Sequence, residues 1–298
     1  MQEPVNLKDA PCWIATLVIL VADVLWGVVG GWKVQLNGLG IHLFIVAFML
    51  SILSIRRFRE EPRVSYTIRL MTLLIIFSNA SAVLSYLIVS TDAPLIDNAL
   101  SSWDKAMGFG WRSFFAWMEN HLLLRQLLQY AYASLLPQLI CMVLFLGFTA
   151  RFSKLVTFIE LLVVSGLTTV LLSGLFPAAG AWKFYGIGSQ VNMQMISHFE
   201  PLRDGTLRTI NLLDMQGLIS IPSFHTVVAI LIAFSMWRTP VAYIFLFLDM
   251  ATIFSTPIEG GHYFVDILAG ALLAVATILV NASRARMTNP RVAVLNQI

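Results

Sequence analysis

Charged residues are scarce in this chain of 298 residues: Asp, Glu, Lys and Arg together make up 12% of it, whereas hydrophobic residues make up 58%. A soluble domain of this size carries about 25% charged residues. The chain also has only two cysteines, Cys12 and Cys141, and both lie at the edge of or inside apolar segments. Their spacing fits neither a metal site nor a disulfide framework. These shortages argue against a soluble domain and against a cysteine-based scaffold.

Long apolar runs fill most of the chain instead, and its mean hydropathy is +0.80. The runs approach about 20 residues, the length that an α-helix needs to cross the hydrocarbon of a bilayer. They lack the alternation of polar and apolar residues that is typical of β-barrel strands. The sequence therefore predicts an all-α polytopic membrane protein. We expect about eight transmembrane helices, over residues 13–32, 39–55, 69–90, 127–150, 154–176, 222–237, 240–257 and 261–282.

A charged linker over residues 56–63 separates the first two expected spans from the other six. We therefore expect an N-terminal transmembrane hairpin with its cytoplasmic linker over residues 1–64. A six-helix core with a C-terminal tail would follow over residues 65–298. We expect no cleaved signal peptide, because the first apolar run ends in Trp26 and Trp32 rather than in a small-residue cleavage site.

Basic residues gather in the short loops that would be cytoplasmic if the N-terminus lies inside, and the linker alone carries four arginines. The positive-inside rule then places both termini in the cytoplasm, as in a multi-pass protein of a bacterial inner membrane. In this context the basic residues are topology signals, and we expect no nucleic-acid partner. The sixth and eighth spans would both begin at the outer, periplasmic face.

Two short polar segments lie at the starts of those two spans, residues 221–226 and 260–266. They place His225, His262 and Asp266 at one level of the membrane. The spacing of four residues between His262 and Asp266 allows the carboxylate to orient one imidazole nitrogen and leave the other as a nucleophile or base. Gly260 and Gly261 allow close approach of the backbone.

His225 follows Ser223 in the first turn of its expected helix, and Ser223 is available to cap that helix. The free N–H groups of a helix start favour an anion, above all phosphate, and a histidine there is suited to protonate a leaving oxygen. Two alternatives stay open: the histidines and Asp266 could be structural hydrogen-bonding groups, or they could bind a metal. No other ligand spacing supports a metal, and we expect neither a metal nor another cofactor.

The same segments carry a family resemblance. Residues Pro222-Ser-Phe-His225 resemble the PSGH-type motif of the type 2 phosphatidic acid phosphatase superfamily, and residues 255–266 resemble its last motif, SRxxxxxHxxxD. The segment 97–111 resembles the loop that precedes the core in many bacterial members. The combination is most similar to the inositol phosphorylceramide synthase-like branch, and the resemblance covers roughly residues 66–282.

The resemblance implies roles for the three residues. His262 would attack phosphorus and become a phosphohistidine, Asp266 would orient it, and His225 would protonate the leaving alcohol and then activate the acceptor, without a metal. The protein would then be an integral-membrane enzyme acting on a membrane lipid phosphoester at the outer face. Water as acceptor would make it a lipid phosphatase, and another alcohol or lipid would make it a lipid phosphotransferase.

The sequence departs from the family pattern where cations are usual. Thr256 stands at the arginine of the last motif, and the KxxxxxxRP motif is not intact, since aligning its arginine on Arg203 puts Ile196 at the lysine and Asp204 at the proline. We expect a phosphate site with fewer cations. Its candidate residues are Arg203, Ser223, Arg208 and Lys183, and for the three cations an interfacial role is the alternative.

Other features support rival functions. Asp23, Glu160 and Asp249 lie inside expected spans, where ionisable groups are often functional, so a transporter is the main alternative. A catalytically inactive lipid-binding homologue is another. The aromatic-rich segment 97–121 is typical of an amphipathic anchor in the membrane interface, or else of a lid over the site.

Overall fold

The structure is a computed structural model that describes residues 9–187, 191 and 196–288. It confirms the predicted all-α architecture of a polytopic membrane protein. Each of the eight expected spans contains a helix, and one span is divided into two helices. The helices are α1 (Ala10–Val29), α2 (Leu36–Ile52), α4 (Pro62–Val89), α7 (Leu122–Ala133), α8 (Leu135–Phe148), α9 (Phe152–Leu175), α12 (Phe224–Met236), α13 (Ala242–Glu259) and α14 (Phe264–Thr288).

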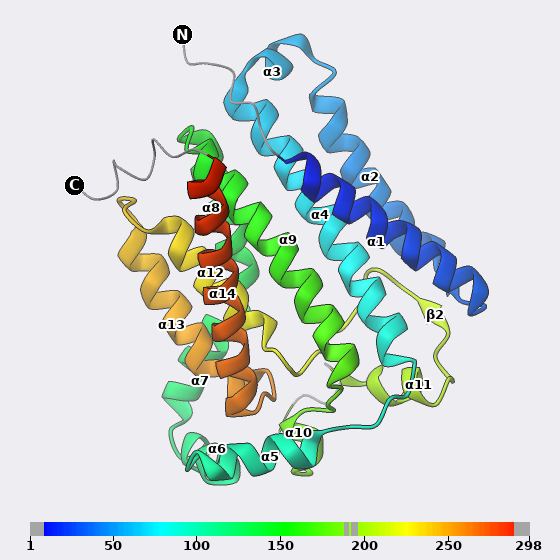
Figure 1. Cartoon of the computed structure of the whole chain (residues 1–298), viewed down its shortest axis with the longest axis vertical. Coiled ribbons are helices and arrows are strands. Elements are labelled where there is room, and N and C mark those ends of the chain that lie inside the picture. Colours follow the sequence, from blue (N-terminus) through cyan, green and yellow to red (C-terminus); the bar gives the residue numbers. More distant parts are fainter. Residues whose placement is uncertain (1–8, 188–190, 192–195, 289–298) are drawn as a thin grey trace.

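Short elements fill the connections between these helices. The charged linker forms α3 (Arg56–Glu60), and the two long loops contain α5 (Asp97–Ala106), α6 (Trp111–Glu119), α10 (Ala181–Phe184) and α11 (Phe199–Arg203). Two strands of two residues each, β1 (Lys33–Val34) and β2 (Thr209–Ile210), pair in parallel. In Figure 1, α3 and the end of α14 lie at one end of the molecule, and α5, α6 and α10 lie at the opposite end.

Five helices in the described part of the chain are long and apolar enough to cross a membrane, and α7 with α8 adds a sixth if this bent pair is one span. The apolar helices α2 and α12 are shorter, at 17 and 13 residues. By length, five or six of the eight predicted spans are full crossings. The remaining two predicted spans correspond to the shorter helices α2 and α12.

The break between α7 and α8 turns the chain by 45°. Pro137 lies in the first turn of α8 and has no N–H to offer to the carbonyl of Ala133, so the helical hydrogen bonding is interrupted there. The bend directs α7 against α13, with which it makes extensive contact, while α8 packs on α4, α9 and α12. This is how α7 reaches the site described below.

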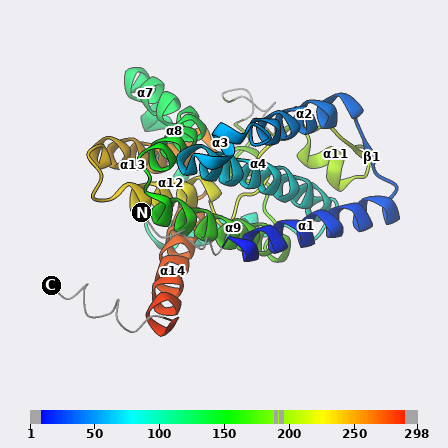
Figure 2. The same cartoon turned by 90° about the horizontal axis from the view of Figure 1, so that it is seen from above.

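Helix α12 is the centre of the core and contacts α8, α9, α13 and α14. It is hydrophobic on all sides, as a helix surrounded by others must be, and Val227, Ala229, Leu231 and Ile232 are fully buried in it. Seen from above, α4 lies between α1 and α2 (Figure 2), and both N-terminal helices contact it. The outward faces of α1 and α2 remain apolar and exposed, as expected for lipid contact.

Candidate active site

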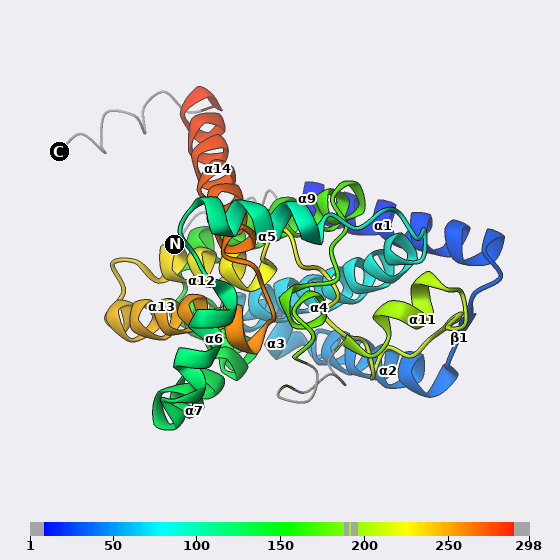
Figure 3. The same ribbon diagram turned by 90° about the horizontal axis from the view of Figure 1, so that it is seen from below.

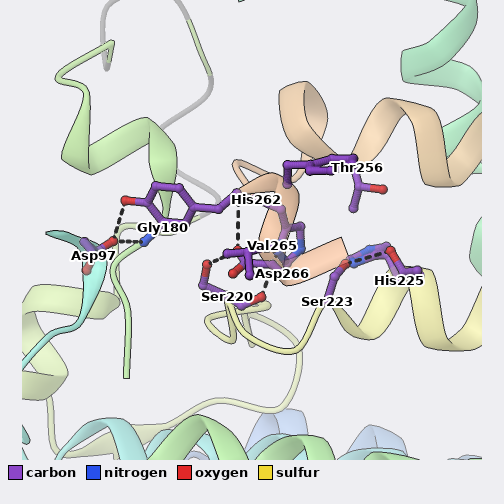
Figure 4. Close-up of polar contacts among 12 residues, drawn as sticks. Asp97, Gly180, Ser220, Ser223, His225, Thr256, His262, Val265 and Asp266 are labelled. Carbon is purple, nitrogen blue, oxygen red and sulfur yellow. Dashed lines mark hydrogen bonds and ion pairs between the residues drawn. The ribbon is translucent and has the colours of Figure 1, made fainter. Parts of the chain in front are cut away.

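The two predicted segments meet at the end of the core that bears α5 and α6. Figure 4 shows His225 at the start of α12 close to His262, which lies in the short turn between α13 and α14. The centroids of the two imidazole rings are 6.3 Å apart, and the ring planes are inclined by 64°. The structure therefore brings both histidines together, as the sequence predicts.

His262 is oriented mainly by a backbone carbonyl. Its Nδ1 is 2.9 Å from the carbonyl oxygen of Ser220, and because that oxygen can only accept, Nδ1 carries the proton. The Nε2 of His262 then has a free lone pair. We expected a direct hydrogen bond to Asp266, but Oδ2 of Asp266 is 3.4 Å from Nδ1, and Nδ1 bonds to the Ser220 carbonyl instead. The reason is that His262 precedes α14, which begins at Phe264, so the pair is not on one regular helix.

Asp266 instead joins the two segments that carry the histidines. Its Oδ2 accepts hydrogen bonds from the Ser220 hydroxyl at 2.7 Å and from the Tyr263 N–H at 2.9 Å. Its backbone carbonyl accepts from the N–H of Ser223 at 3.0 Å. The carboxylate is fully buried. Asp266 thus fixes Ser220, and the carbonyl of Ser220 fixes the imidazole of His262.

His225 is oriented by a tyrosine that the sequence did not suggest. Its ring stacks on that of Tyr132 of α7, with centroids 4.4 Å apart, and its Nδ1 is 3.3 Å from the tyrosine hydroxyl. The Nε2 of His225 takes no part in this contact. No motif or spacing marks Tyr132 in the sequence, because its position depends on the bend after α7.

Gly260 and Gly261 make room for these rings, as predicted. A β-carbon on Gly260 would lie 2.8 Å from the His262 ring and 2.9 Å from the Tyr132 hydroxyl. Gly261 has a φ of +63°, and a β-carbon there would lie 2.8 Å from the indole of Trp182. That indole donates from Nε1 to the carbonyl of Ile258 at 2.7 Å. The turn between α13 and α14 can therefore be this tight only with glycine at both positions.

The histidines lie at one end of a cavity of about 220 Å³ that extends into the core between α4, α8, α9 and α12. Gly260 and Tyr132 also line this end, and most of the remaining surface is apolar. The described residues that line the cavity include no lysine and no arginine. The cavity thus presents a mostly apolar wall next to the imidazoles.

The outer helix α5 supports the turn that carries His262. Both oxygens of Asp104 accept hydrogen bonds from the first N–H groups of α14, those of Phe264 and Val265, each at 2.9 Å. Asp104 is fully buried, and burial raises its pKa more than the two backbone N–H groups lower it. A carboxylate supplied by another helix therefore caps α14, where the helix dipole favours negative charge.

Asp97 lies on α5 two turns before Asp104. It holds the loop before α10 in the same way. Its carboxylate accepts from the N–H groups of Ala179 and Gly180 and from the hydroxyl of Tyr263, at 2.9–3.0 Å. From α6, the indole of Trp111 donates to the carbonyl of His262 at 3.0 Å. Seen from below, α5 and α6 lie across this end of the bundle (Figure 3). These contacts hold the loop and the His262 turn in place, and the spacing of seven residues puts Asp97 and Asp104 on one face of α5.

The three candidate cations lie elsewhere. Arg203 pairs with Asp92 at 2.6 Å and donates to the carbonyl of Ala93, so it joins α11 to the loop after α4. Lys183 pairs with Glu200. Arg208 lies over the ring of Trp32, 5.0 Å from its centroid, beside the β1–β2 pair. None of the three lines the cavity with the histidines.

Ser223 and Thr256, by contrast, are close to the histidines (Figure 4). Ser223 is the N-cap residue of α12, but its side chain makes no cap hydrogen bond to the helix and instead accepts from the hydroxyl of Thr226. The first N–H groups of α12 are therefore left without a side-chain cap. The hydroxyl of Thr256 donates to carbonyls of its own helix, so this position supplies no charge.

Arg125 of α7, which the sequence analysis did not single out, lies 3.7 Å from Glu259 beside Gly260.

The carboxylates inside the spans do not form a second site. Glu160 of α9 accepts from Asn281 at 3.2 Å, Asp23 lies on α1, and Asp249 lines a separate apolar cavity between α12, α13 and α14. Within the described residues, no group of three His, Cys, Asp or Glu side chains is arranged to hold a metal ion. Cys12 and Cys141 are both unpaired.

Comparison with known proteins gives one match. A family model described as the PAP2 superfamily matches residues 98–280, which is more than half of the chain. No curated protein and no solved structure matches it. The matched range contains Asp104, which supports the His262 turn, and both histidine segments. The chain therefore belongs to the PAP2 superfamily, whose members are generally phosphatases or phosphotransferases.

Proposed function

We propose that this protein is a membrane lipid phosphatase or lipid phosphotransferase that works through a phosphohistidine at His262. One observation carries the proposal: His225 and His262 face each other at the end of an apolar cavity, and the hydrogen bond from Nδ1 to Ser220 leaves Nε2 of His262 free. Family membership supports the phosphoryl chemistry. The cavity supports a lipid as the substrate.

In the first step, Nε2 of His262 attacks the phosphorus of the lipid phosphoester and an N–P bond forms. The bond from phosphorus to the lipid oxygen breaks, and this oxygen leaves with a proton from Nε2 of His225. As the acid, His225 is an imidazolium: its Nδ1–H donates to the Tyr132 hydroxyl, which orients the ring, and its Nε2–H delivers the proton and leaves a neutral imidazole. His225 is thus the acid and His262 the nucleophile.

In the second step, His225 accepts a proton from water or from an acceptor alcohol, whose oxygen attacks phosphorus. The N–P bond breaks, its electron pair returns to His262, and phosphate or the transferred product leaves. Water gives hydrolysis and an alcohol gives transfer. The uncapped N–H groups at the start of α12, together with Ser223, are the groups we assign to the phosphate, since helix starts bind anions. No step requires a metal.

The test is phosphate release, or formation of a transferred lipid, by purified protein supplied with lipid phosphates. His262→Ala should lower kcat/KM by at least about a thousandfold, the scale of losing a nucleophile. His121→Ala is the matched control, because His121 is an exposed histidine outside the cavity whose ring contacts Trp117 of α6. EDTA should leave the activity unchanged and vanadate should inhibit it.

Activity that EDTA abolishes would refute the mechanism without a metal, and full activity of His262→Ala would refute the nucleophile. Binding of lipid phosphates without any product would instead show an inactive lipid-binding homologue. Movement of a labelled solute across liposomes, without any product, would favour the transporter.

A further inference from the structure

Two buried hydroxyl groups that line the apolar cavity have no hydrogen-bond partner. Ser81 of α4 and Thr169 of α9 both line it, and in each the hydroxyl oxygen is inaccessible to solvent and makes no hydrogen bond. Thr169 is only 1% exposed. Buried hydroxyl groups in proteins are almost always hydrogen-bonded, so two such groups on the wall of one cavity need an explanation.

Neighbouring hydroxyl groups on the same two helices do have hydrogen-bond partners. On α4, the hydroxyl of Ser85 donates to the carbonyl of Ala82 at 2.7 Å, although Ser85 lines the same cavity. On α9, the hydroxyl of Thr168 donates to the carbonyl of Val164 at 2.8 Å. Serine and threonine in a helix usually make such a bond to an earlier carbonyl. Ser81 and Thr169 do not, and they face the cavity from two different helices.

The depth of the two residues decides what could reach them. Ser81 lies two turns before the end of α4 at Val89, about 12 Å along its axis, and Thr169 lies about 9 Å before the end of α9 at Leu175. The histidines line the same cavity, His225 at the start of α12 and His262 just after the end of α13. A ligand that places phosphate at the histidines would therefore extend its next groups toward these hydroxyls.

We infer that Ser81 and Thr169 form a subsite that hydrogen-bonds the polar linkage of an acylated lipid, its ester or amide carbonyl. This inference rests on the proposed function and names the class of substrate. A carbonyl close to the phosphate accepts hydrogen bonds from both hydroxyls while the first methylene groups of an acyl chain enter the apolar part of the cavity. A polyprenyl phosphate has no acceptor at that position and would leave both hydroxyls unpaired, which disfavours it.

The experiment compares dioleoyl phosphatidic acid with the matched dialkyl ether lipid, which lacks both carbonyls, and with a polyprenyl phosphate. The proteins are the wild type, the double variant Ser81→Ala with Thr169→Val, and the control double variant Thr72→Val with Thr168→Val. The control removes one hydroxyl from each of the same two helices, and both of these are already bonded to helix carbonyls. Two quantities are measured: kcat/KM for phosphate release, and lipid affinity from thermal stabilisation of the protein.

The wild type should prefer the diacyl lipid over the ether lipid by about threefold to tenfold for each hydroxyl, the scale of one neutral hydrogen bond. The subsite variant should lose this preference and the control should keep it. A wild type without the preference, or a subsite variant that retains it, overturns the inference. If no lipid releases phosphate but the affinity preference is present and is lost in the subsite variant, the subsite stands and the proposed reaction fails.

Discussion

At the scale of single residues, Asp266 does something different from what its spacing to His262 suggests. The pair was predicted as a direct hydrogen bond, but the structure routes the orientation of His262 through the carbonyl of Ser220, while Asp266 fixes Ser220. A backbone carbonyl cannot be recognised from side-chain spacing. This explains why the residues of the site were predictable while the way they hold one another was not.

This arrangement separates two substitutions of Asp266. In Asp266→Asn one amide oxygen remains to accept from the Ser220 hydroxyl and the Tyr263 N–H, so the loop keeps its position. In Asp266→Ala both donors lose their partner inside the protein, which we expect to lower the free energy of unfolding by about 2–4 kcal/mol. We therefore expect Asp266→Asn to retain the wild-type melting temperature within a few degrees and Asp266→Ala to lower it strongly.

Differential scanning fluorimetry in detergent measures this difference, and phosphate release measures the accompanying loss of kcat. Equal melting temperatures for the two variants would contradict the role of Asp266 as the residue that joins the loops.

The three candidate cations were not placed correctly by the sequence. Arg203, Arg208 and Lys183 are in the right loop, but loop membership does not say which way a side chain extends, and Arg203 is paired with Asp92.

At the scale of helices, the unexpected element is α5. An amphipathic segment rich in aromatic residues predicts a position in the membrane interface, and the exposed Trp103 and Trp117 fit that position. Its buried side was not predictable, because Asp97 and Asp104 look like solvated charges until the N–H groups of the turn that carries His262 are placed against them. The bend after α7 is different: Pro137 is visible in the sequence and could have marked it.

The cap on α14 gives a test for α5. Asp104→Ala leaves the first two N–H groups of α14 without their partner, so the His262 turn should lose its fixed geometry. We expect kcat to fall more than about tenfold with KM for the lipid changed less than about threefold, since Asp104 does not line the cavity. Asp104→Asn keeps one acceptor oxygen, and its kcat should lie between those of the wild type and of Asp104→Ala.

Steady-state kinetics on both variants make this measurement, with Lys105→Ala, an exposed residue of the same helix, as the control. If Asp104→Ala only reduced the amount of folded protein, the kcat of the remaining folded enzyme would be unchanged, and Asp104→Asn would not recover activity. An unchanged kcat in Asp104→Ala would show that α5 does not position His262.

At the scale of the whole molecule, the spans were largely predictable because a bilayer imposes one length and one polarity on every crossing segment. The structure has helices in all eight predicted ranges, yet α2 and α12 are shorter than a full crossing. Helix α12 can be short because it is surrounded by protein and its start is sunk into the core. Its length follows from the position of the site, which no count of apolar residues reveals.

The sidedness predicted from the basic loops is testable by labelling. Ser102→Cys on α5 and Arg57→Cys on α3 place exposed thiols at opposite ends of the molecule. Cys141 is exposed and is replaced by alanine in both, whereas Cys12 is buried and can stay. A membrane-impermeant maleimide should label Ser102→Cys in cells with a permeabilised outer envelope and label Arg57→Cys only after the inner membrane is opened. The reverse pattern would place the histidines on the cytoplasmic side.

The lack of cationic side chains among the described residues of the cavity wall has a consequence for how substrates compete. An anion is drawn to a cluster of arginines from the water, with a range set by salt, about 10 Å at 0.1 M. A site that holds phosphate through helix N–H groups, without lysine or arginine, exerts less pull at such distances. A phosphate group would then be retained only when its hydrocarbon already occupies the cavity. Inorganic phosphate, which has no hydrocarbon, would leave easily, so the product of hydrolysis would compete poorly with the lipid that arrives from within the bilayer.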